Sequence, residues 1–399
     1  MSETDSALTA EQAASRLGVK RQTLYAYVSR GLLSRTVALD GRTSLFDAAS
    51  VDALRSQRRR VADGEVPTII ASSLTSIDLG GHYYRGRSVV ELVANDEPFE
   101  RVADLLWDDV GVWALDSDTS ARVREANAPL PGATPLLDRL RITVALLSAL
   151  DPLRNDLTTP SVAQAGRTML LAMVAGLHKL HLGPRELLSD QLWLSLTITP
   201  GTADQRRALN AALVLLADHG LAASTFAVRI AASVRADPYS LVSTGLGAMG
   251  GVLHGGASAQ VHHLFDQAHL LGADVVLGRE LAAHRHLPGV GHAIYRGSDP
   301  RDVALFELIE AGWSATPRFE VVATMRELFL RRLPKAPNVD FSLGALTWLA
   351  DMEPSAGQLF AIARTAGWIG HAIEELDEAA VRFRPVARYV GPHPNAHPL

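Results

Sequence analysis

Residues 245–258, GLGAMGGVLHGGAS, decide between two fold classes. The segment begins with G-x-G-x-x-G, which cradles a dinucleotide only where a strand precedes it and a βαβ unit surrounds it. The preceding residues indicate a helix broken at Asp237-Pro238, and the chain around them lacks alternating strands and helices. We therefore expect a bend rather than a phosphate cradle, one that presents His254 between glycines where a ligand can approach the imidazole closely.

The sequence on both sides of this segment is typical of helices. Apolar residues recur at helical spacing, with Ala and Leu dominant, in residues 134–150, 161–180, 204–234 and 355–376. A chain of 399 residues exceeds the usual limit of one hydrophobic core, so more than one domain is expected. The pattern predicts a mainly α protein with an all-helical body over residues 63–399.

Composition excludes several classes of chemistry. The chain has no cysteine, so disulfides, thiolate nucleophiles and sulfur-based zinc sites are excluded. Its first residues are polar and acidic, and it contains no uncharged apolar run of about 18 residues. These features predict a soluble cytoplasmic protein with no membrane partner. The other histidines and carboxylates do not have the spacing of metal ligands, so no metal is expected.

Residues 1–62 differ from the rest in charge, with ten Lys and Arg against six Asp and Glu, whereas the whole chain has a net charge of -5. Thr9 and Gln12 have capping-box spacing for a helix that ends near Gly18, and a second helix follows before Gly31. Asp40-Gly41 lies between two β-prone runs and predicts a hairpin. Asp47 is placed to cap a last helix.

This segment resembles the small winged helix-turn-helix domains of the MerR and excisionase type. The resemblance implies that the second helix enters the DNA major groove and that the wing touches the backbone. The candidate DNA contacts are Lys20, Arg21, Gln22, Tyr25 and Arg42. The alternative is a vestigial or protein-binding helical module, because the net positive charge is modest.

Two further segments are framed by glycine or proline, as His254 is. PGVGHAIYRGSDPR places His292 after a Pro-Gly-x-Gly bend and Arg301 nine residues later, and KAPNVDFSLG isolates Asp340 between a turn and a glycine. Two imidazoles, a carboxylate and a guanidinium in separate loops can form an acid-base constellation with an anion clamp.

These segments resemble the signatures of the citrate synthase family. GVLHGGAS is similar to G-x-L-H-G-G-A-N, PGVGHAIYRGSDPR to the P-G-x-G-H and D-P-R signatures, and PNVDF to the aspartate motif. The likeness extends to DHGLAASTF, ARTAGW and the Arg-Pro pair at residue 384, and more loosely to SLTSIDLGGHYYRGRSVVEL. The resemblance therefore spans about residues 68–391 in the family's order. It implies condensation of an acyl-CoA with oxaloacetate, followed by hydrolysis of citryl-CoA.

The resemblance also implies a role for each residue. Asp340 would be the base, His254 would donate a hydrogen bond to the thioester oxygen, and His292 would polarise the ketone of oxaloacetate. Substrate carboxylates would be bound by His219, Arg301, Arg364 and, from the partner subunit, Arg384. The bend at Pro288, Gly289 and Gly291 would hold the adenine end of CoA, which is a co-substrate, and no permanent cofactor is implied.

The implied architecture is a citrate synthase-like two-domain helical fold, preceded by the winged helix-turn-helix domain of residues 1–62. A small domain would be inserted at about residues 257–350 of the 63–399 body, and a homodimer would share its active sites. This sequence departs from the family signatures at Ala222 and Ser258, where asparagines are usual, which puts the positioning of neighbouring groups in doubt.

Two alternatives stay open at this point. Propionyl-CoA could replace acetyl-CoA and give 2-methylcitrate, because one methylene changes discrimination by only about 1–3 kcal/mol. The chain could instead be a ligand-responsive DNA-binding regulator that has kept the pocket and lost turnover.

Overall fold

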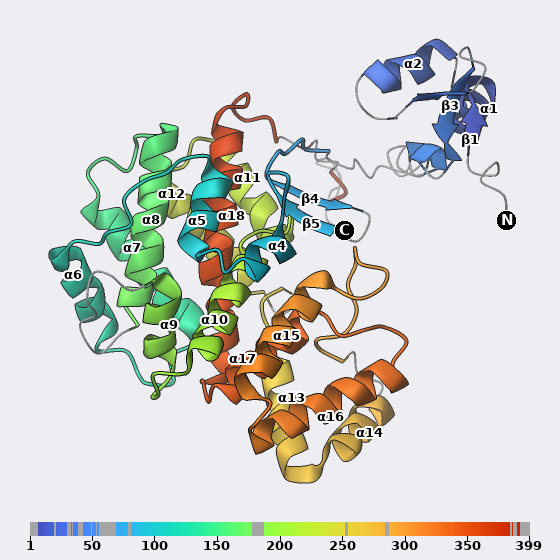
Figure 1. Cartoon of the computed structure of the whole chain (residues 1–399). Coiled ribbons are helices and arrows are strands. Elements are labelled where there is room, and N and C mark those ends of the chain that lie inside the picture. The colour runs from blue at the N-terminus through green and yellow to red at the C-terminus, as the bar shows by residue number, and fades with distance from the viewer. Residues whose placement is uncertain are drawn as a thin grey trace, which may run out of the picture. The chain divides into compact units, whose positions relative to one another are not determined.

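The computed structural model describes residues 7–19, 21–29, 33, 35–38, 43–48, 50–52, 54–55, 69–78, 81–177, 187–251, 254–283, 287–383, 385 and 389–391. The chain divides into two compact units, Met1–Ala71 and Ser72–Leu399 (Figure 1). The boundary predicted between residues 62 and 63 lies among residues outside these ranges, so it stays a prediction. Each unit is considered by itself below.

The first unit combines helices with a small antiparallel sheet of strand order β1-β3-β2. Its elements are β1 (Ala7–Thr9), α1 (Ala10–Leu17), α2 (Arg21–Ser29), β2 (Thr36–Val37) and β3 (Ser44–Asp47). The predicted capping box of Thr9 and Gln12 is confirmed, as is the end of α1 at Gly18, which has a left-handed φ of 64°. Asp47 accepts hydrogen bonds from the Ser50 backbone and hydroxyl, both 2.8 Å.

This unit has a hydrophobic core of its own. Leu24 and Phe46 are at most 1% exposed and pack with Ala13, Leu17 and Val51. The predicted turn at Asp40-Gly41 lies outside the described residues, but β2 and β3 on either side of it pair antiparallel.

The second unit begins with a three-stranded sheet that the sequence did not predict. Strands β4 (Thr75–Asp78), β5 (Gly81–Tyr84) and β6 (Arg87–Ser88) are antiparallel in that order. The expectation of an all-helical body was therefore wrong at this point. The strands are only two to four residues long, and such short runs carry too few alternations for a period of two to stand out.

The rest of the second unit is helical, as predicted. Its helices are α4 (Val89–Ala94), α5 (Phe99–Trp107), α6 (Ser117–Asn127), α7 (Leu136–Leu150), α8 (Thr159–Ala175), α9 (Leu188–Leu196), α10 (Ala203–Leu216), α11 (Ala223–Ser233), α12 (Pro238–Met249), α13 (Ala257–Leu271), α14 (Ala273–Ala282), α15 (Pro300–Trp313), α16 (Pro317–Arg332), α17 (Val339–Leu349), the 3₁₀ turn η2 (Pro354–Gln358) and α18 (Leu359–Leu376).

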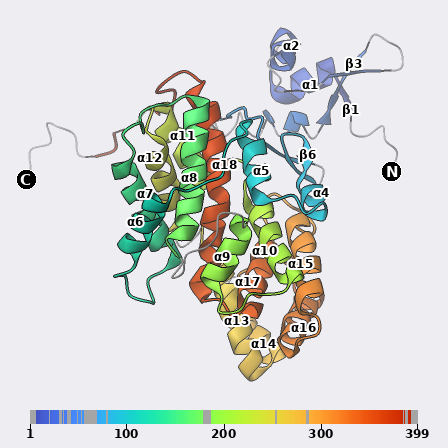
Figure 2. The same ribbon diagram turned by 60° about the vertical axis from the view of Figure 1, so that its left-hand side comes forward.

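Helix α18 is the central element of this unit. It contacts α5, α8, α10, α11 and α12, and Figures 1 and 2 show other helices around it in both views. Its residues are buried on every side, which is typical of an interior helix rather than an amphipathic one. The predicted helix at 355–376 is thus confirmed from Leu359 onward, with residues 355–358 in the 3₁₀ turn η2, and its apolar composition reflects burial on all faces.

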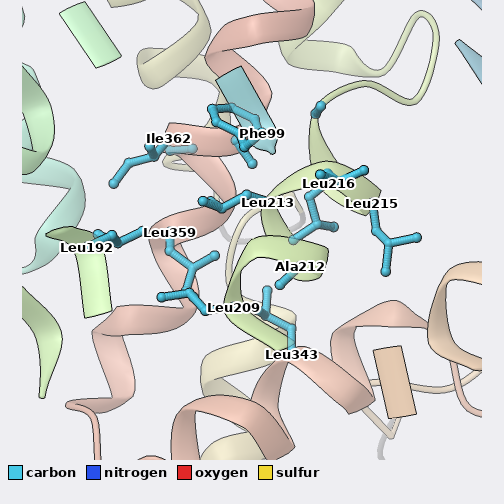
Figure 3. Close-up of a cluster of buried hydrophobic side chains, with 14 of the residues drawn as sticks. Phe99, Leu192, Leu209, Ala212, Leu213, Leu215, Leu216, Leu343, Leu359 and Ile362 are labelled. Carbon is cyan, nitrogen blue, oxygen red and sulfur yellow. The ribbon is translucent and has the colours of Figure 1, made fainter. Parts of the chain in front are cut away.

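Helices α10 and α18 meet in the middle of the core. Figure 3 shows Leu209 and Leu213 of α10 beside Leu359 and Ile362 of α18. Side chains of three other helices join this cluster, namely Phe99 of α5, Leu192 of α9 and Leu343 of α17. Because α10 ends at residue 216, this packing fixes the chain that continues directly to His219.

Helices α13 to α17 cover residues 257–349, the range predicted for an inserted small domain. Helix α13 packs on α14, α16 and α17, and α15 packs on α17 and α16. Helix α15 also contacts α10, and all these helices belong to the same compact unit as the rest of the body. A separately moving small domain therefore stays a prediction.

The glycine-rich stretch at 245–249 is helix rather than loop. Gly245 and Gly247 lie inside α12, which begins at Pro238 after an Asp237 cap, as the predicted helix break requires. A Cβ on Gly245 would lie 2.6 Å from the Trp368 ring, so this glycine permits close packing of α12 on α18. The expectation of a bend holds only from Gly250 onward, and no strand precedes the motif.

Within the part of the chain that is described, no helix has the length and apolar content needed to cross a membrane.

The start of α11 generates a prediction about stability. Ala222 occupies its N-cap position and makes no side-chain capping bond. Asparagine can accept a hydrogen bond from a backbone N–H of the first turn, so Ala222→Asn should raise the free energy of unfolding by about 1 kcal/mol. Urea unfolding at pH 7 measures this gain. As a control of opposite sign, Thr202→Ala removes the capping box of α10 and should cost about 1 kcal/mol. No gain for Ala222→Asn would contradict the prediction.

Candidate active site

A short antiparallel pairing joins the loop of His292 to the segment of Asp340. Val290 bridges Pro337, the Asn338 N–H donates to the Gly289 carbonyl at 2.9 Å, and the Gly291 N–H donates to the Ala336 carbonyl at 2.8 Å. The Asn338 side chain adds a bond to the Gly291 carbonyl at 2.6 Å. Two segments far apart in the sequence are thereby held side by side.

The two glycines of this loop are required by its geometry. Gly289 and Gly291 have φ angles of 74° and 72°, which favour glycine. A Cβ on Gly289 would lie 2.7 Å from the Val261 side chain and 3.1 Å from the Phe341 backbone. The predicted tight bend is therefore confirmed as a close approach of the loop to α13 and α17.

Asp340 lies in the first turn of α17, next to the Asn338 cap, whose Oδ1 accepts its N–H at 3.0 Å. Among the described residues, its carboxylate has no hydrogen-bond or ion-pair partner. Burial raises the pKa of Asp340 to about 6, with a contribution from Asp299, although Arg301 and Arg364 act in the opposite direction. A partly buried carboxylate that ionises near neutrality is suited to accept a proton.

His254 follows the turn at the end of α12. Its Nε2 lies 2.8 Å from Ser224 Oγ, which also accepts the Trp368 indole N–H at 3.3 Å. The serine hydroxyl hydrogen remains available for donation to Nε2, and that bond corresponds to the tautomer that carries the ring proton on Nδ1. Burial, then the charge of Arg364, lowers the pKa of His254. A neutral imidazole with an N–H to donate results.

The rings of His292, His219 and Tyr295 form a cluster in which each ring lies close to the other two. The centroids of His292 and His219 are 4.9 Å apart, and His219 Nε2 lies 3.1 Å from the Tyr295 hydroxyl. His292 Nδ1 accepts the Ile294 N–H at 3.1 Å, which leaves the ring proton on Nε2. Burial, then Arg301, lowers the pKa of both histidines, so both are neutral.

Two buried guanidinium groups complete the cluster. Arg301, 3% exposed, makes two bonds of 3.0 and 2.8 Å to Asp299, and its other terminal nitrogen has no hydrogen-bond partner within the described ranges. Arg364, 1% exposed, donates to the Leu216 carbonyl at 3.0 Å and has no carboxylate within ion-pair distance in the described ranges. A buried cation without an anion is costly, so this guanidinium marks a place for a negatively charged ligand.

The electrostatics show that these groups share one neighbourhood. The charge of Arg301 acts on His219, His292 and Asp340, and that of Arg364 acts on His219, His254 and Asp340. The structure thus brings together six of the residues predicted for chemistry and substrate binding: His219, His254, His292, Arg301, Asp340 and Arg364.

The other residues predicted for substrate or DNA binding are only partly described by the structure. Arg384, Lys20 and Arg42 lie outside the described residues, and the side chain of Gln22 is not described. Arg21 begins α2, and Tyr25 on the same helix lies 3.2 Å from Ser44 through its hydroxyl. Among the described residues, no three His, Asp or Glu side chains are grouped as a metal site would require.

Sequence reasoning missed several residues that build the cluster. Asp299 holds Arg301 and also accepts the Val339 N–H at 3.1 Å, so it ties α15 to α17. Ser224 orients His254. His82 of β5 lies 5.3 Å from the His219 ring and is almost completely buried. Each of the three lies in a segment that resembles the family, Asp299 in D-P-R, Ser224 in DHGLAASTF and His82 in SLTSIDLGGHYYRGRSVVEL, but none of them was assigned a role.

The second departure from the family signatures, Ser258, is explained by packing. A Cβ on Gly357 would lie 2.6 Å from Ser258 Oγ, and the serine is 3% exposed. A larger side chain would require η2 to move.

Comparison with known proteins places this geometry in context. Residues 66–386 match the family model described as "Citrate synthase, C-terminal domain". The chain is 28% identical to a citrate synthase of Synechocystis sp. over 339 residues, which cover 78% of this chain and 85% of that protein. It is 26% identical to 2-methylcitrate synthase 1 of Corynebacterium glutamicum over 374 residues, covering 84% and 96%.

A solved structure shares the fold. The citrate synthase of Thermoplasma acidophilum, in a ternary complex with carboxymethyl coenzyme A and oxaloacetate, superposes with a TM-score of 0.71 at 22% identity. The match covers 85% of this chain and 98% of that chain.

The raised pKa of Asp340 generates a prediction about stability and pH. Its folded value is about 6, against about 3.9 in an unfolded chain, so stability present at low pH is lost as pH rises from about 4 through about 6. Asp340→Asn cannot ionise and should raise the free energy of unfolding by about 1–3 kcal/mol at pH 8, with almost no gain at pH 4.

Urea unfolding at both pH values measures the difference. Asp274→Asn, at an exposed first-turn position of α14, is the matched control and should show no gain at either pH. An equal gain at pH 4 and pH 8 for Asp340→Asn would contradict a raised pKa.

Proposed function

Because the chain belongs to the citrate synthase family, we propose that it condenses acetyl-CoA with oxaloacetate to give citrate and free CoA. Membership makes it an acyltransferase that uses an acyl-CoA co-substrate and no permanent cofactor. The observation that carries the specific proposal is the carboxylate of Asp340, which has no partner among the described residues and a pKa of about 6, beside neutral imidazoles and two buried guanidinium groups.

The first chemical step is removal of a proton from the methyl group of acetyl-CoA. Asp340 accepts this proton, and the electron pair of the C–H bond moves toward the thioester carbonyl. His254 donates its Nδ1–H to that oxygen, which stabilises the enolate as it forms. The lowered pKa of His254 supports this role, because a neutral imidazole can donate a hydrogen bond to the thioester oxygen as negative charge develops on that oxygen.

The second step joins two carbons. The enolate carbon attacks the ketone carbon of oxaloacetate, and the ketone oxygen takes the Nε2 proton of His292 as it becomes the citryl hydroxyl. Water then attacks the thioester carbonyl of citryl-CoA and gives up a proton, which returns His292 to its neutral form. The C–S bond breaks, and the sulfur leaves as the CoA thiol with the proton that Asp340 had accepted. The fixed Nδ1 acceptor bond of His292 supports its assignment as an Nε2 donor.

Substrate binding follows from the positive charges. Oxaloacetate carries two carboxylates, and guanidinium groups bind such groups in a fork geometry. Arg364 and the free nitrogen of Arg301 would bind them with His219, and Arg384 of a partner subunit would add a third guanidinium. The role of Arg384 requires a second subunit, so we also propose that the chain forms a homodimer with shared active sites.

The loop at 288–291 would hold the adenine end of CoA. Gly289 and Gly291 already use backbone groups in the pairing with residues 336–338. In an antiparallel bridge of this kind the intervening residue directs its own N–H and carbonyl away from the partner strand. Val290 therefore has the backbone groups that support adenine binding.

The acyl preference is tested by thiol release from acetyl-CoA and propionyl-CoA in the presence of oxaloacetate. We expect a higher kcat/KM for acetyl-CoA, by about 10-fold, the order expected for one methylene. A preference for propionyl-CoA would make the protein a 2-methylcitrate synthase instead.

In the same assay Asp340→Asn should lower kcat by about 10²–10⁴-fold because the base is lost. Asp274→Asn should leave it unchanged, and near-normal turnover by Asp340→Asn would remove Asp340 from the base role.

We propose DNA binding as a second function, carried by the first unit. A hydrogen bond with Ser44, and then one with Arg21, lowers the pKa of Tyr25, and the charges of Arg21 and Arg35 act in the same direction. Arg21 of α2 and Arg35, the residue before β2, thus both act on Tyr25. Such a cluster on the second helix is suited to phosphate contact.

Gel shifts with mixed-sequence duplex DNA test this proposal. We expect binding whose affinity falls steeply between about 50 and 200 mM salt. Arg21→Ala should weaken it about uniformly across sequences. Arg16→Ala is the matched control, because Arg16 is already paired with Asp52 at 2.5 Å and should contribute little. Absence of salt-dependent binding, with and without oxaloacetate, would exclude the DNA-binding function.

A further inference from the structure

His82 is a buried histidine that makes no hydrogen bond with any described residue. It is 2% exposed, and both of its ring nitrogens lack a partner. Leaving a buried polar group unsatisfied costs about 1–3 kcal/mol, and native proteins contain few such groups. An imidazole with two unsatisfied nitrogens therefore indicates something that binds there when the protein functions.

The strand that carries His82 directs it toward the candidate active site. Residues two apart on a strand share a face, so His82 and Tyr84 of β5 lie on one side. The Tyr84 hydroxyl donates to the Val214 carbonyl at 3.0 Å and accepts the Asp218 N–H at 3.1 Å. This face therefore packs on the end of α10 and the segment that leads to His219. Unlike His82, Tyr84 has its polar atom fully used.

His82 lies beside residues of the candidate active site that would bind the substrate carboxylates. Its ring lies edge-on to His219, with centroids 5.3 Å apart, and His219 in turn lies 4.9 Å from His292. The three imidazoles form one row. The charges of Arg301 and Arg364 both act on His82, and Asp218 acts in the opposite direction.

The imidazole of His82 is neutral in this environment. Burial, then Arg301, lowers the pKa of His82 to about 3. A neutral ring has one N–H donor and one acceptor, so it can add a hydrogen bond beside the two guanidinium groups without adding a third positive charge. A metal ion does not account for the free nitrogens, because no group of three ligating side chains is found within the described ranges.

We infer that His82 is a further substrate-binding residue, whose ring N–H donates to a carboxylate oxygen of a 2-oxo dicarboxylate held by Arg301 and Arg364. This inference rests on the proposed function, because oxaloacetate is the substrate of that class in the condensation. His82 thereby binds one substrate carboxylate through a hydrogen bond, in addition to the electrostatic attraction of the two guanidinium groups. An enclosed water molecule is the competing occupant.

The test is the affinity for oxaloacetate in the absence of any acyl-CoA, measured by isothermal titration calorimetry. His82→Leu removes both nitrogens and should weaken binding by at least about 10-fold, the size expected for a lost bond to a charged group. His82→Gln keeps an N–H donor and should recover most of the affinity. In steady-state assays of His82→Leu, the KM for oxaloacetate should rise with little change in the KM for acetyl-CoA.

Tyr83→Phe is the matched control, because Tyr83 is on the opposite face of the same strand and should bind oxaloacetate as the wild type does. Urea unfolding confirms that each variant is folded. If the wild type binds and His82→Leu binds equally well, His82 holds only water and the inference is overturned. If Gln fails to recover what Leu loses, the lost affinity reflects packing, which also overturns it. If the wild type does not bind oxaloacetate, the proposed function fails and this inference fails with it.

Discussion

The chemistry proposed for this chain depends on one short piece of antiparallel backbone pairing. Gly289 and Gly291 exchange hydrogen bonds with residues 336 and 338, and the Asn338 side chain adds a third. Three bonds over so few residues fix both the loop that ends in His292 and the helix start that carries Asp340. Asp299 strengthens the same junction, because one carboxylate holds Arg301 and the first N–H of α17. The groups that we propose as proton acceptor, proton donor and anion clamp are thus positioned by connected backbone.

Burial then determines the charge state of each group. The imidazoles have lowered pKa values because they are desolvated beside guanidinium groups, so they donate hydrogen bonds while neutral. The same desolvation raises the pKa of Asp340, and the nearby arginines limit that rise to about 6. Arg364 has little freedom to escape this environment because α18 is interior on every side. A substrate with two negative charges would relieve the cost of burying these cations.

The sequence predicted some elements and missed others for identifiable reasons. The helix break at Asp237-Pro238 and the capping box at Thr9 were correct because both signals are local. The glycines at 245–250 were assigned to a loop, whereas Gly245 serves the packing of α12 on Trp368, a contact between residues distant in sequence. Strands β4 to β6 were missed because they are too short to show a period. His82 was missed for the same reason, since its burial follows from that sheet.

The sequence by itself determined the mainly helical class. It also selected His254, His292, Asp340 and Arg301 as candidate site residues, because glycine and proline around them are local signals of special backbone geometry. Only the tertiary structure decided that these side chains meet, that Arg364 lacks a carboxylate among the described residues, and that His82 has no partner among them. It also decided the pKa of Asp340. The physical reason is that desolvation and pairing depend on which distant segments exclude water from a group, and no local pattern encodes that.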